Sequence, residues 1–201
     1  MDIKLTNKED VKALNLSDQF RTPPELFKEL DGVFHFFWDA CCNSDNCLVP
    51  NEQMVGANYD YLTHEWRGGI REYQQKWFPE CSIFINPPYS RGSVLPIMKK
   101  AWEDAKYFRV VMLLKCDMST DWANYPYDES SACPLIEMQH TDESIASGCT
   151  HLYAQMQAYK FTSGILFLRK RIKFNDSEGI PSKSGAKFPN MIVILDRRFH
   201  Q

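Results

Sequence analysis

Apolar residues recur along this chain at spacings that predict alternating helices and strands. Helical spacing of apolar positions predicts helices over 22–30 and 94–107. Short apolar runs predict buried strands, which we place at 33–39, 81–85, 109–115, 163–170 and 191–196. Because strands and helices alternate through the middle of the chain, we expect an α/β layered sheet.

Local signals refine the ends of these elements. Residues 22–25 (TPPE) predict a helix start, in which the side chain of Thr22 caps the helix and the prolines occupy its first turn. Residues 31–32 (DG) predict the turn that ends this helix. Near the carboxyl terminus, we expect residues 171–174 close to the turn of a β-hairpin and a loop over 176–189, which is rich in Gly, Pro, Ser and Lys.

The length and composition indicate one globular domain. The 201 residues suffice for one well-buried domain and are rather few for two, with 44% hydrophobic and 24% charged residues. No apolar run reaches the roughly 20 residues that span a bilayer, and the charged first ten residues lack the core of a signal peptide. We therefore expect a cytoplasmic protein without membrane association, folded as a single domain over 1–201.

Residues 116–158 carry few strong patterns, although they contain several aromatic residues and turn formers. A stretch of this length in a compact domain is usually functional or only partly ordered. We predict that it is either a target-recognition segment or a divergent insertion.

The seven cysteines favour reduced thiols, because their number is odd and no Cys-x-x-Cys pair occurs. A metal site would have to combine scattered side chains, for which the candidates are Cys133, His140, Cys149 and His151. We favour thiols that pack as small hydrophobic groups, and we predict no metal site.

The distribution of charge is more informative than the net charge of −3. Residues 160–201 contain nine Lys and Arg against three Asp and Glu, so positive charge concentrates there. Binding to a polyphosphate needs such a local positive face rather than a basic protein as a whole. A solvated basic edge on an ordinary domain explains the charge pattern equally well.

The most specific chemical signal is the segment Asn86-Pro87-Pro88-Tyr89, which follows the strand predicted at 81–85. Sheets of α/β proteins place ligands at the carboxyl ends of their strands, and two prolines stiffen the backbone there while removing two N–H donors. The side-chain carbonyl of Asn86 and the main-chain carbonyl of Pro87 could accept the two N–H bonds of an exocyclic amine on a flipped base, on which Tyr89 stacks. These bonds would draw the nitrogen lone pair out of conjugation and aim it at an electrophilic methyl group.

Two other interpretations of this tetrapeptide are a surface turn and a Pro-Pro-x-Tyr ligand for a small recognition domain. Its position directly after an apolar strand weighs against both. We therefore favour an amino-methyltransferase.

Four segments resemble, in the same order, elements of the phage-type DNA N-6-adenine methyltransferase family. Residues 86–89 (NPPY) resemble motif IV of amino-methyltransferases that act on N6 of adenine or N4 of cytosine. Residues 18–27 (DQFRTPPELF) are similar to the opening of the family, with Phe20 where the family often has Trp. Residues 39–43 (DACCN) resemble its degenerate motif I, and residues 171–174 (RIKF) resemble a late element.

The resemblance covers most of 18–115 and 160–196, and it carries implications for fold, chemistry and partners. It implies a Rossmann-like methyltransferase fold with a mixed, mostly parallel sheet and a C-terminal β-hairpin. It also implies methyl transfer from S-adenosylmethionine to N6 of adenine in double-stranded DNA, with site-specific or relaxed specificity. A phage or prophage origin, the cytoplasm of a bacterial host and a role in restriction and modification follow from the resemblance alone.

The resemblance further implies roles for individual residues. Thr22 and Pro23 would help to hold the methionine part of the cofactor, and Asp39 would accept a hydrogen bond from its α-amino group. Asp60 would bond the amine of the cofactor's adenine, although a surface aspartate is an equal alternative. The catalytic segment that binds and orients the target base would be Asn86, Pro87, Pro88 and Tyr89.

Basic residues near two of the resembling segments, 86–89 and 171–174, are candidates for DNA contacts. Arg91 could contact a phosphate or fill the gap that the flipped base leaves. Arg169, Arg171 and Lys173 could follow the DNA backbone. As exposed charges, these residues need no function.

One departure from larger methyltransferases leaves alternatives open. No glycine lies between Gly32 and Gly56, so the Gly-rich form of motif I is absent. That absence supports an alternative in which the chain is a non-catalytic binding relic of the fold. For an enzyme, N4 of cytosine, RNA and protein glutamine are the alternative substrates, since each presents a planar amine. The sequence identifies neither a recognised DNA sequence nor the oligomeric state.

Overall fold

A computed structural model describes residues 20–42, 46–49, 61–63, 82–90, 92–117, 119–124 and 164–198. In this part of the chain, five strands form one sheet in the order β1-β2-β3-β5-β4. The strands are β1 (Phe36–Asp39), β2 (Ser82–Ile85), β3 (Arg109–Lys115), β4 (Gly164–Phe167) and β5 (Asn190–Leu195). The expected α/β class is therefore confirmed.

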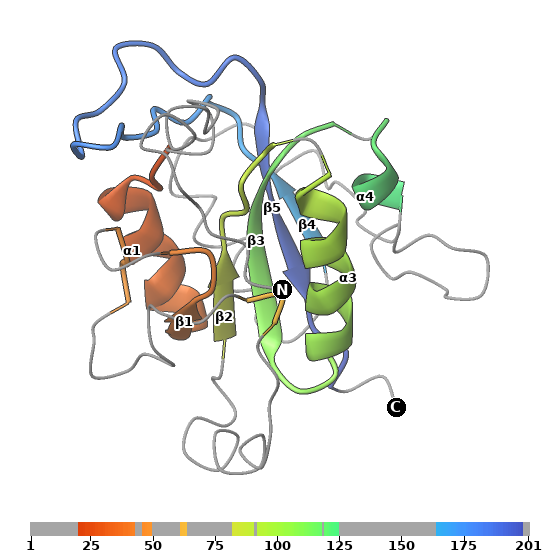
Figure 1. Cartoon of the computed structure of the whole chain (residues 1–201). Coiled ribbons are helices and arrows are strands. Elements are labelled where there is room, and N and C mark those ends of the chain that lie inside the picture. Colours follow the sequence, from red (N-terminus) through yellow and green to blue (C-terminus); the bar gives the residue numbers. More distant parts are fainter. Residues whose placement is uncertain are drawn as a thin grey trace, which may run out of the picture.

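The sheet is mixed, as predicted. β1, β2 and β3 are parallel neighbours, whereas β5 is antiparallel to both β3 and β4. β4 consequently runs in the same direction as the first three strands, and β5 is the reversed strand between them (Figure 1). The carboxyl ends of β1 and β2 therefore meet at one edge of the sheet, where the chain continues into Asp39 and Asn86.

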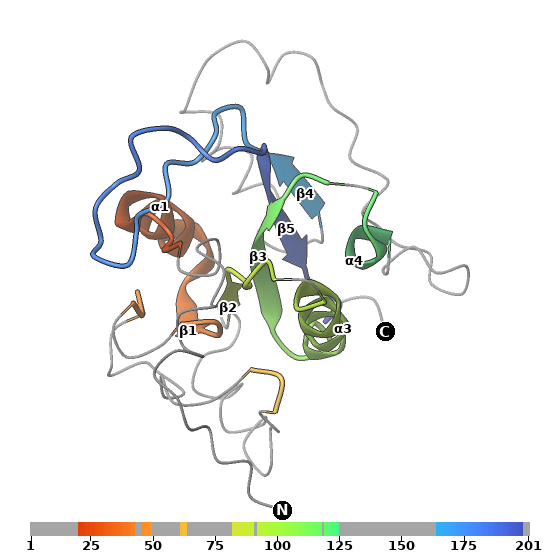
Figure 2. The same ribbon diagram turned by 45° about the horizontal axis from the view of Figure 1, so that its top comes forward.

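Two helices cover opposite faces of the sheet (Figures 1 and 2). Helix α1 (Pro24–Phe34) packs on one face through Phe27, Leu30 and Val33, and helix α3 (Val94–Asp104) packs on the other. A short helix, α4 (Asp121–Asn124), follows β3. None of the helices in the described part of the chain is both long and apolar enough to cross a membrane.

Strand β3 lies at the centre of the sheet and contributes side chains to both layers. Val110, Met112 and Leu114 belong to the cluster under α3, whereas Val111 and Leu113 belong to the cluster under α1. This alternation follows from the two-residue period of a strand. Because both faces are covered, the strand reads as one continuous apolar run, which is why the sequence predicted it with the correct ends.

Helix α1 differs from its prediction at both ends. Its N-cap is Pro23, without a side-chain cap, so the prediction that Thr22 caps the helix is wrong. The helix also continues through Asp31-Gly32, because Val33 and Phe34 are buried against the sheet. It ends at His35, whose left-handed backbone (φ 53°) allows its N–H to donate to the carbonyl of Asp31.

The last two strands are antiparallel neighbours, but a long connection over 168–189 separates them. Residues 171–174 do not sit at a tight turn. Ile172 and Phe174 are buried against the layer of α1, and the backbone N–H of Ala186 donates to the carbonyl of Ile172 over 2.7 Å. This connection is also joined to the segment before α1, since Arg21 and Asn175 exchange two backbone hydrogen bonds.

Candidate active site

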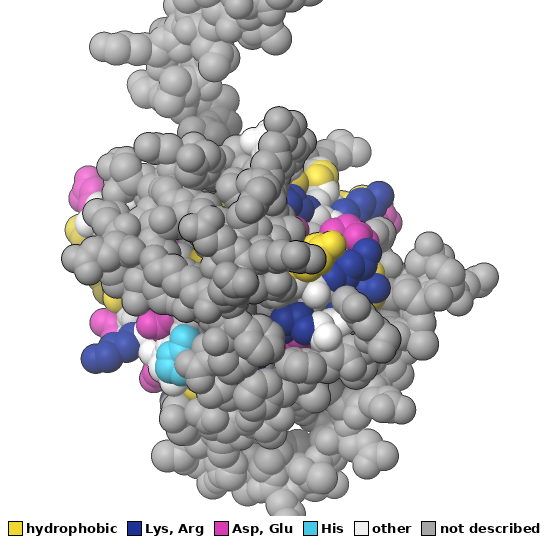
Figure 3. All heavy atoms as spheres, turned by 90° about the horizontal axis from the view of Figure 1, so that it is seen from below, with side chains coloured by type: hydrophobic (Ala, Val, Ile, Leu, Met, Phe, Trp, Pro, Cys, Tyr) yellow, Lys and Arg dark blue, Asp and Glu magenta, His cyan; other side chains and the backbone are white. Residues whose placement is uncertain are grey.

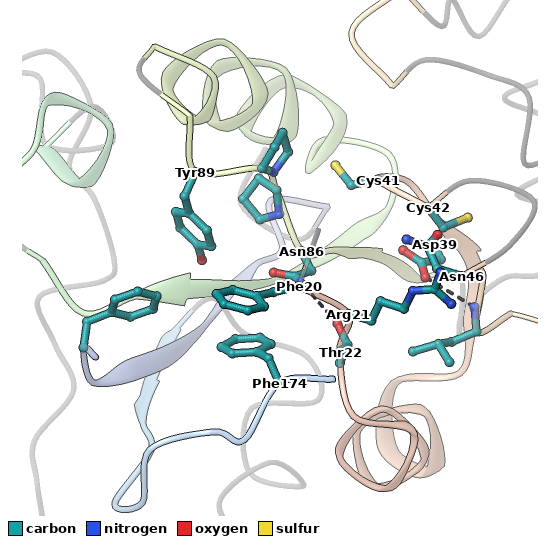
Figure 4. Close-up of a pocket in the computed structure, with 14 residues that line it drawn as sticks. Phe20, Arg21, Thr22, Asp39, Cys41, Cys42, Asn46, Asn86, Tyr89 and Phe174 are labelled. Carbon is teal, nitrogen blue, oxygen red and sulfur yellow. Dashed lines mark hydrogen bonds between the residues drawn. The ribbon is translucent and has the colours of Figure 1, made fainter. Parts of the chain in front are cut away.

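A pocket lies at the carboxyl ends of β1 and β2 (Figure 4). Its empty space of about 740 Å³ includes open solvent. Its lining comes from the segment before α1, the ends of β1 and β2, and the 168–189 connection: Phe20, Arg21, Thr22, Asp39, Cys41, Cys42, Asn46, Leu48, Asn86, Pro87, Pro88, Tyr89, Phe174 and Phe188.

Asn86 and Thr22 meet at the centre of the pocket. The side-chain amide of Asn86 donates a hydrogen bond of 3.1 Å to the hydroxyl oxygen of Thr22 (Figure 4). Thr22 is buried with 6% of its surface exposed, so the acceptor is held in place by packing. The bond fixes the orientation of the Asn86 amide and leaves its carbonyl oxygen as the group that can accept a bond from a ligand.

The two prolines after Asn86 continue the wall of the pocket. Pro87 is buried and Pro88 is half-buried. Among the described residues, no donor is hydrogen-bonded to the carbonyl oxygen of Pro87 or to Oδ1 of Asn86. Two acceptors therefore lie on adjacent residues at the end of β2, without a proline N–H to compete for them.

Tyr89 forms the aromatic side of the pocket. Its hydroxyl donates a hydrogen bond of 2.9 Å to the carbonyl of Leu113, and burial raises the pKa of Tyr89, so the phenol stays protonated. Phe188 lies 6.0 Å away between ring centroids, tilted by 52°. The ammonium group of Lys115 lies over both rings, 4.3 Å from the centroid of Tyr89 and 4.5 Å from that of Phe188.

A second aromatic pair joins the early and late parts of the chain. The rings of Phe20 and Phe174 are stacked, with centroids 6.0 Å apart and planes 17° apart. Figure 4 shows this pair beside Asn86, between the Tyr89 side and the Asp39 side of the pocket. The described part of the first resembling segment, 20–27, is therefore in direct contact with 171–174 through Phe20 and Phe174, although about 150 residues separate them.

Asp39 forms the acidic side of the pocket. It is the last residue of β1 and is 6% exposed, and its Oδ2 accepts a weak hydrogen bond of 3.4 Å from the backbone N–H of Leu48. Burial first, and the nearby Cys47 second, raise the pKa of Asp39 to about 7. Among the described residues, no basic side chain forms an ion pair with this carboxylate. The site thus presents a buried acid that a cationic ligand group would stabilise.

The whole chain was compared with known protein families and structures. A model of the DNA N-6-adenine-methyltransferase (Dam) family matches residues 10–201. The chain belongs to this family. The match confirms the resemblance seen in the sequence, and the family description supports methylation of adenine N6 with DNA as the substrate. Neither the search of curated proteins nor the search of solved structures gives a match.

The pocket of this family member contains six of the twelve catalytic, cofactor-binding and DNA-binding candidates singled out from the sequence. Thr22, Asp39 and the segment 86–89 all line it. Pro23 is half-buried and precedes α1 without lining the pocket. Several other candidates lie outside the described residues: Asp60, Arg91, Cys133, His140, Cys149, His151 and the greater part of 116–158.

The basic candidates of the 168–189 connection lie on its outer side. Arg169, Arg171 and Lys173 are exposed, whereas Ile172 and Phe174 between and after them are buried. The three cations therefore point away from the core, and none of them lines the pocket.

Figure 3 views the molecule from below, where the parallel strands begin. On that face, described basic and acidic side chains lie next to one another rather than forming a patch of one sign.

Sequence reasoning missed several residues of the pocket. Asn46 and Leu48 follow the degenerate motif I closely, and this proximity along the chain is the signal that could have found them. Lys115 ends a strand that was predicted correctly, and its place at the carboxyl end of that strand could likewise have marked it. No local pattern marked Phe188, because only the folding of the 168–189 connection brings it to Tyr89.

One group among the described residues has a composition that could hold a metal ion. Ligand atoms of Asp39, Cys42 and Cys47 all lie within 4.8 Å of one another. Structural zinc sites use four protein ligands, and this group offers three. The absence of a metal site stays a prediction.

Proposed function

We propose that this chain transfers a methyl group from S-adenosylmethionine to N6 of adenine in double-stranded DNA, using Asn86, Pro87, Pro88 and Tyr89. The observation that carries the proposal is the hydrogen bond from Asn86 to Thr22, in a pocket that also contains the acid Asp39. The family of the chain supports the adenine and DNA parts of the proposal. The methyl donor, the duplex and the individual residue roles are our inference.

Asn86 and Pro87 would bind the reacting amine. With its N–H group donated to Thr22, Asn86 keeps Oδ1 to accept one N–H of the adenine amine, and the carbonyl of Pro87 accepts the other. Both bonds favour a tetrahedral nitrogen whose lone pair points at the methyl group. No strong general base is needed, since the methylated amine is acidic enough to lose its proton to water. The rate enhancement would come mostly from positioning.

Tyr89 would hold the flipped base by stacking. Its hydroxyl is anchored to Leu113, which fixes the plane of the ring. Because Lys115 covers one side of the ring, a base would stack on the other side. Such stacking contributes about 1–3 kcal/mol per base. The target adenine must leave the duplex to reach this position.

The acidic side of the pocket fits the cofactor. S-adenosylmethionine supplies a methyl group on a sulfonium and carries an α-ammonium group that Asp39 would bind. The fit rests on the raised pKa of Asp39, because a buried acid without a basic partner is stabilised as a carboxylate when a cation binds. Thr22 and Pro23 would border the methionine part, and Asp60 would bond the cofactor's adenine. The strand order, with β5 reversed between β3 and β4, supports a Rossmann-like methyltransferase fold.

DNA would lie across the face next to the 168–189 connection. Arg169, Arg171 and Lys173 are exposed and would neutralise phosphates there, and Arg91 would act beside the flipped base. These contacts position the duplex and carry no sequence information.

The decisive test incubates the purified protein with tritiated S-adenosylmethionine and unmethylated DNA, followed by mass spectrometry of the nucleosides. We expect N6-methyladenine from the wild type and at least a hundredfold loss in Asn86→Ala. A thermal shift with S-adenosylmethionine should persist in that variant, which separates lost catalysis from lost folding. Detection of N4-methylcytosine instead would identify cytosine as the substrate. The absence of both methylation and cofactor binding would favour the alternative in which the chain is a non-catalytic binding relic.

A further inference from the structure

Two cysteine thiols lie beside the carboxylate of Asp39. Cys42 lines the pocket, and Cys47 immediately precedes Leu48, whose N–H donates to Asp39. Both thiols are half-buried. Small solutes can therefore still reach them. Their sulfur atoms lie within 4.8 Å of each other and of an oxygen of the Asp39 carboxylate.

The two thiols have different acidities. The hydrogen bond from Cys42 lowers the pKa of Cys47 to about 7, because it stabilises the thiolate. The same hydrogen bond and burial raise the pKa of Cys42, which therefore stays protonated. Near neutral pH a substantial fraction of the protein thus carries a Cys47 thiolate beside a Cys42 thiol, which is the arrangement of a reactive dithiol.

We propose that Cys42 and Cys47 are an oxidative modification site, at which a peroxide forms a disulfide that weakens cofactor binding. In the first step, the Cys47 thiolate attacks a peroxide oxygen, the O–O bond breaks, and a sulfenic acid forms while hydroxide leaves. In the second step, the Cys42 sulfur attacks that sulfenic acid, the S–O bond breaks, and the departing hydroxide takes the Cys42 proton. Two thiols and one hydrogen peroxide thus give one disulfide and two waters.

Oxidation would disturb the acidic side of the pocket in two ways. A disulfide brings the sulfurs to about 2.05 Å, closer than two unbonded thiols can approach, and so would pull Cys47 and the adjoining N–H of Leu48 away from Asp39. It also removes the negative charge of Cys47, which attracts the α-ammonium group of the cofactor. This consequence rests on the proposed function, whereas formation of the disulfide does not.

The chemical half of the proposal is tested by peptide mass spectrometry of the full-length protein. After treatment with hydrogen peroxide and alkylation, the tryptic peptide 29–67 should lose two hydrogens and show a Cys42–Cys47 link. The loss should reverse with dithiothreitol and be absent in Cys47→Ser. Cys116→Ser is the matched control, because Cys116 is another half-buried free thiol, and it should behave as the wild type. Unmodified thiols at millimolar peroxide, or a bound zinc ion that occupies them, would overturn the proposal.

The regulatory half is tested by calorimetry with S-adenosylmethionine at pH 8, where Asp39 is ionised in both redox states. We expect the dissociation constant to rise at least tenfold on oxidation and to recover on reduction. The dissociation constant of Cys47→Ser should be the same with and without peroxide, because this variant cannot form the disulfide. An unchanged dissociation constant in protein shown to carry the disulfide would refute the regulation. Failure of the reduced protein to bind would instead refute the proposed function, and the regulation with it.

Discussion

The side chains of Asn86 and Thr22 are joined by a hydrogen bond of 3.1 Å, although the residues lie 64 positions apart in the chain. Each residue precedes a Pro-Pro pair, so the bond connects two rigid segments. One segment starts α1 and the other follows β2, which places the contact between the first helix and the sheet. The amide that we assign to catalysis is therefore oriented by the segment that we assign to cofactor binding.

The first prediction concerns the acceptor of this bond. Thr22→Val keeps the shape of the buried side chain and removes the hydroxyl, so the Asn86 amide loses its partner. We expect kcat at saturating cofactor to fall about 2- to 13-fold, since a single hydrogen bond contributes about 0.5–1.5 kcal/mol. Methyl transfer from tritiated S-adenosylmethionine measures the effect.

Thr22→Ser is the matched control, because it retains the hydroxyl and should keep kcat within about twofold of the wild type. The melting temperature of Thr22→Val should lie slightly below that of Thr22→Ser, because Thr22→Val loses one hydrogen bond to a buried side chain. Wild-type kcat in Thr22→Val would show that the bond to Asn86 does not limit catalysis.

The sequence predicted the central strands and the chemical motif better than the ends of the chain's elements. β3 has the predicted ends, and β2 begins one residue later than predicted. Both are short, apolar runs that are buried on two sides. The Asn86–Tyr89 segment was also located correctly at a strand end, because its place after an apolar run is visible locally.

What the sequence did not predict depends on contacts between distant residues. Thr22 accepts a bond from Asn86 instead of capping α1, because the sheet brings these residues together. Residues 171–174 pack against α1 and Phe20 rather than at a turn, since Ile172 and Phe174 gain burial there. Local propensity does not contain either contact.

The second prediction separates the ring of Tyr89 from its hydroxyl. Tyr89→Ala removes the stacking surface and should lower kcat/KM for DNA about 5- to 150-fold, corresponding to about 1–3 kcal/mol. Tyr89→Phe keeps the ring and loses only the bond to Leu113, so it should cost about 1 kcal/mol of folding stability. Its kcat/KM should stay near that of the wild type. Equal losses of kcat/KM in Tyr89→Ala and Tyr89→Phe would argue against stacking as the role of Tyr89.

The third prediction concerns the exposed cations of the 168–189 connection. Each phosphate contact contributes about −0.9 to the slope of log affinity against log salt concentration. The double variant Arg171→Gln/Lys173→Gln should therefore bind DNA more weakly and with a slope shallower by about two. Its affinity for S-adenosylmethionine should not change, because neither residue lines the pocket.

Lys106→Gln is the matched control for the DNA measurement. The side chain of Lys106 is 38% exposed, but it pairs with Glu103 just after α3, away from the proposed DNA face. Its removal should leave the salt slope unchanged. An equal change of slope in the control and the double variant would contradict a specific DNA face at the connection.

The last prediction follows from the pKa of Asp39, which is raised to about 7 by burial first and by Cys47 second. Only the ionised carboxylate attracts the α-ammonium group, so protonation of Asp39 opposes cofactor binding. The dissociation constant for S-adenosylmethionine should therefore fall about tenfold per pH unit as the pH rises toward 7, and level off above it. Calorimetry between pH 5.5 and 7.5 measures the profile.

Two variants test the origin of that pH dependence. Asp39→Asn should bind weakly, with a flat profile over the same range, because it has no proton to lose. Cys47→Ser removes the neighbouring charge that raises the pKa of Asp39, so the midpoint of its profile should move to lower pH. If the dissociation constant of Asp39→Asn still changed with pH up to about 7, a group other than Asp39 would be responsible for the pH dependence. An unshifted midpoint in Cys47→Ser would mean that burial alone sets the pKa of Asp39.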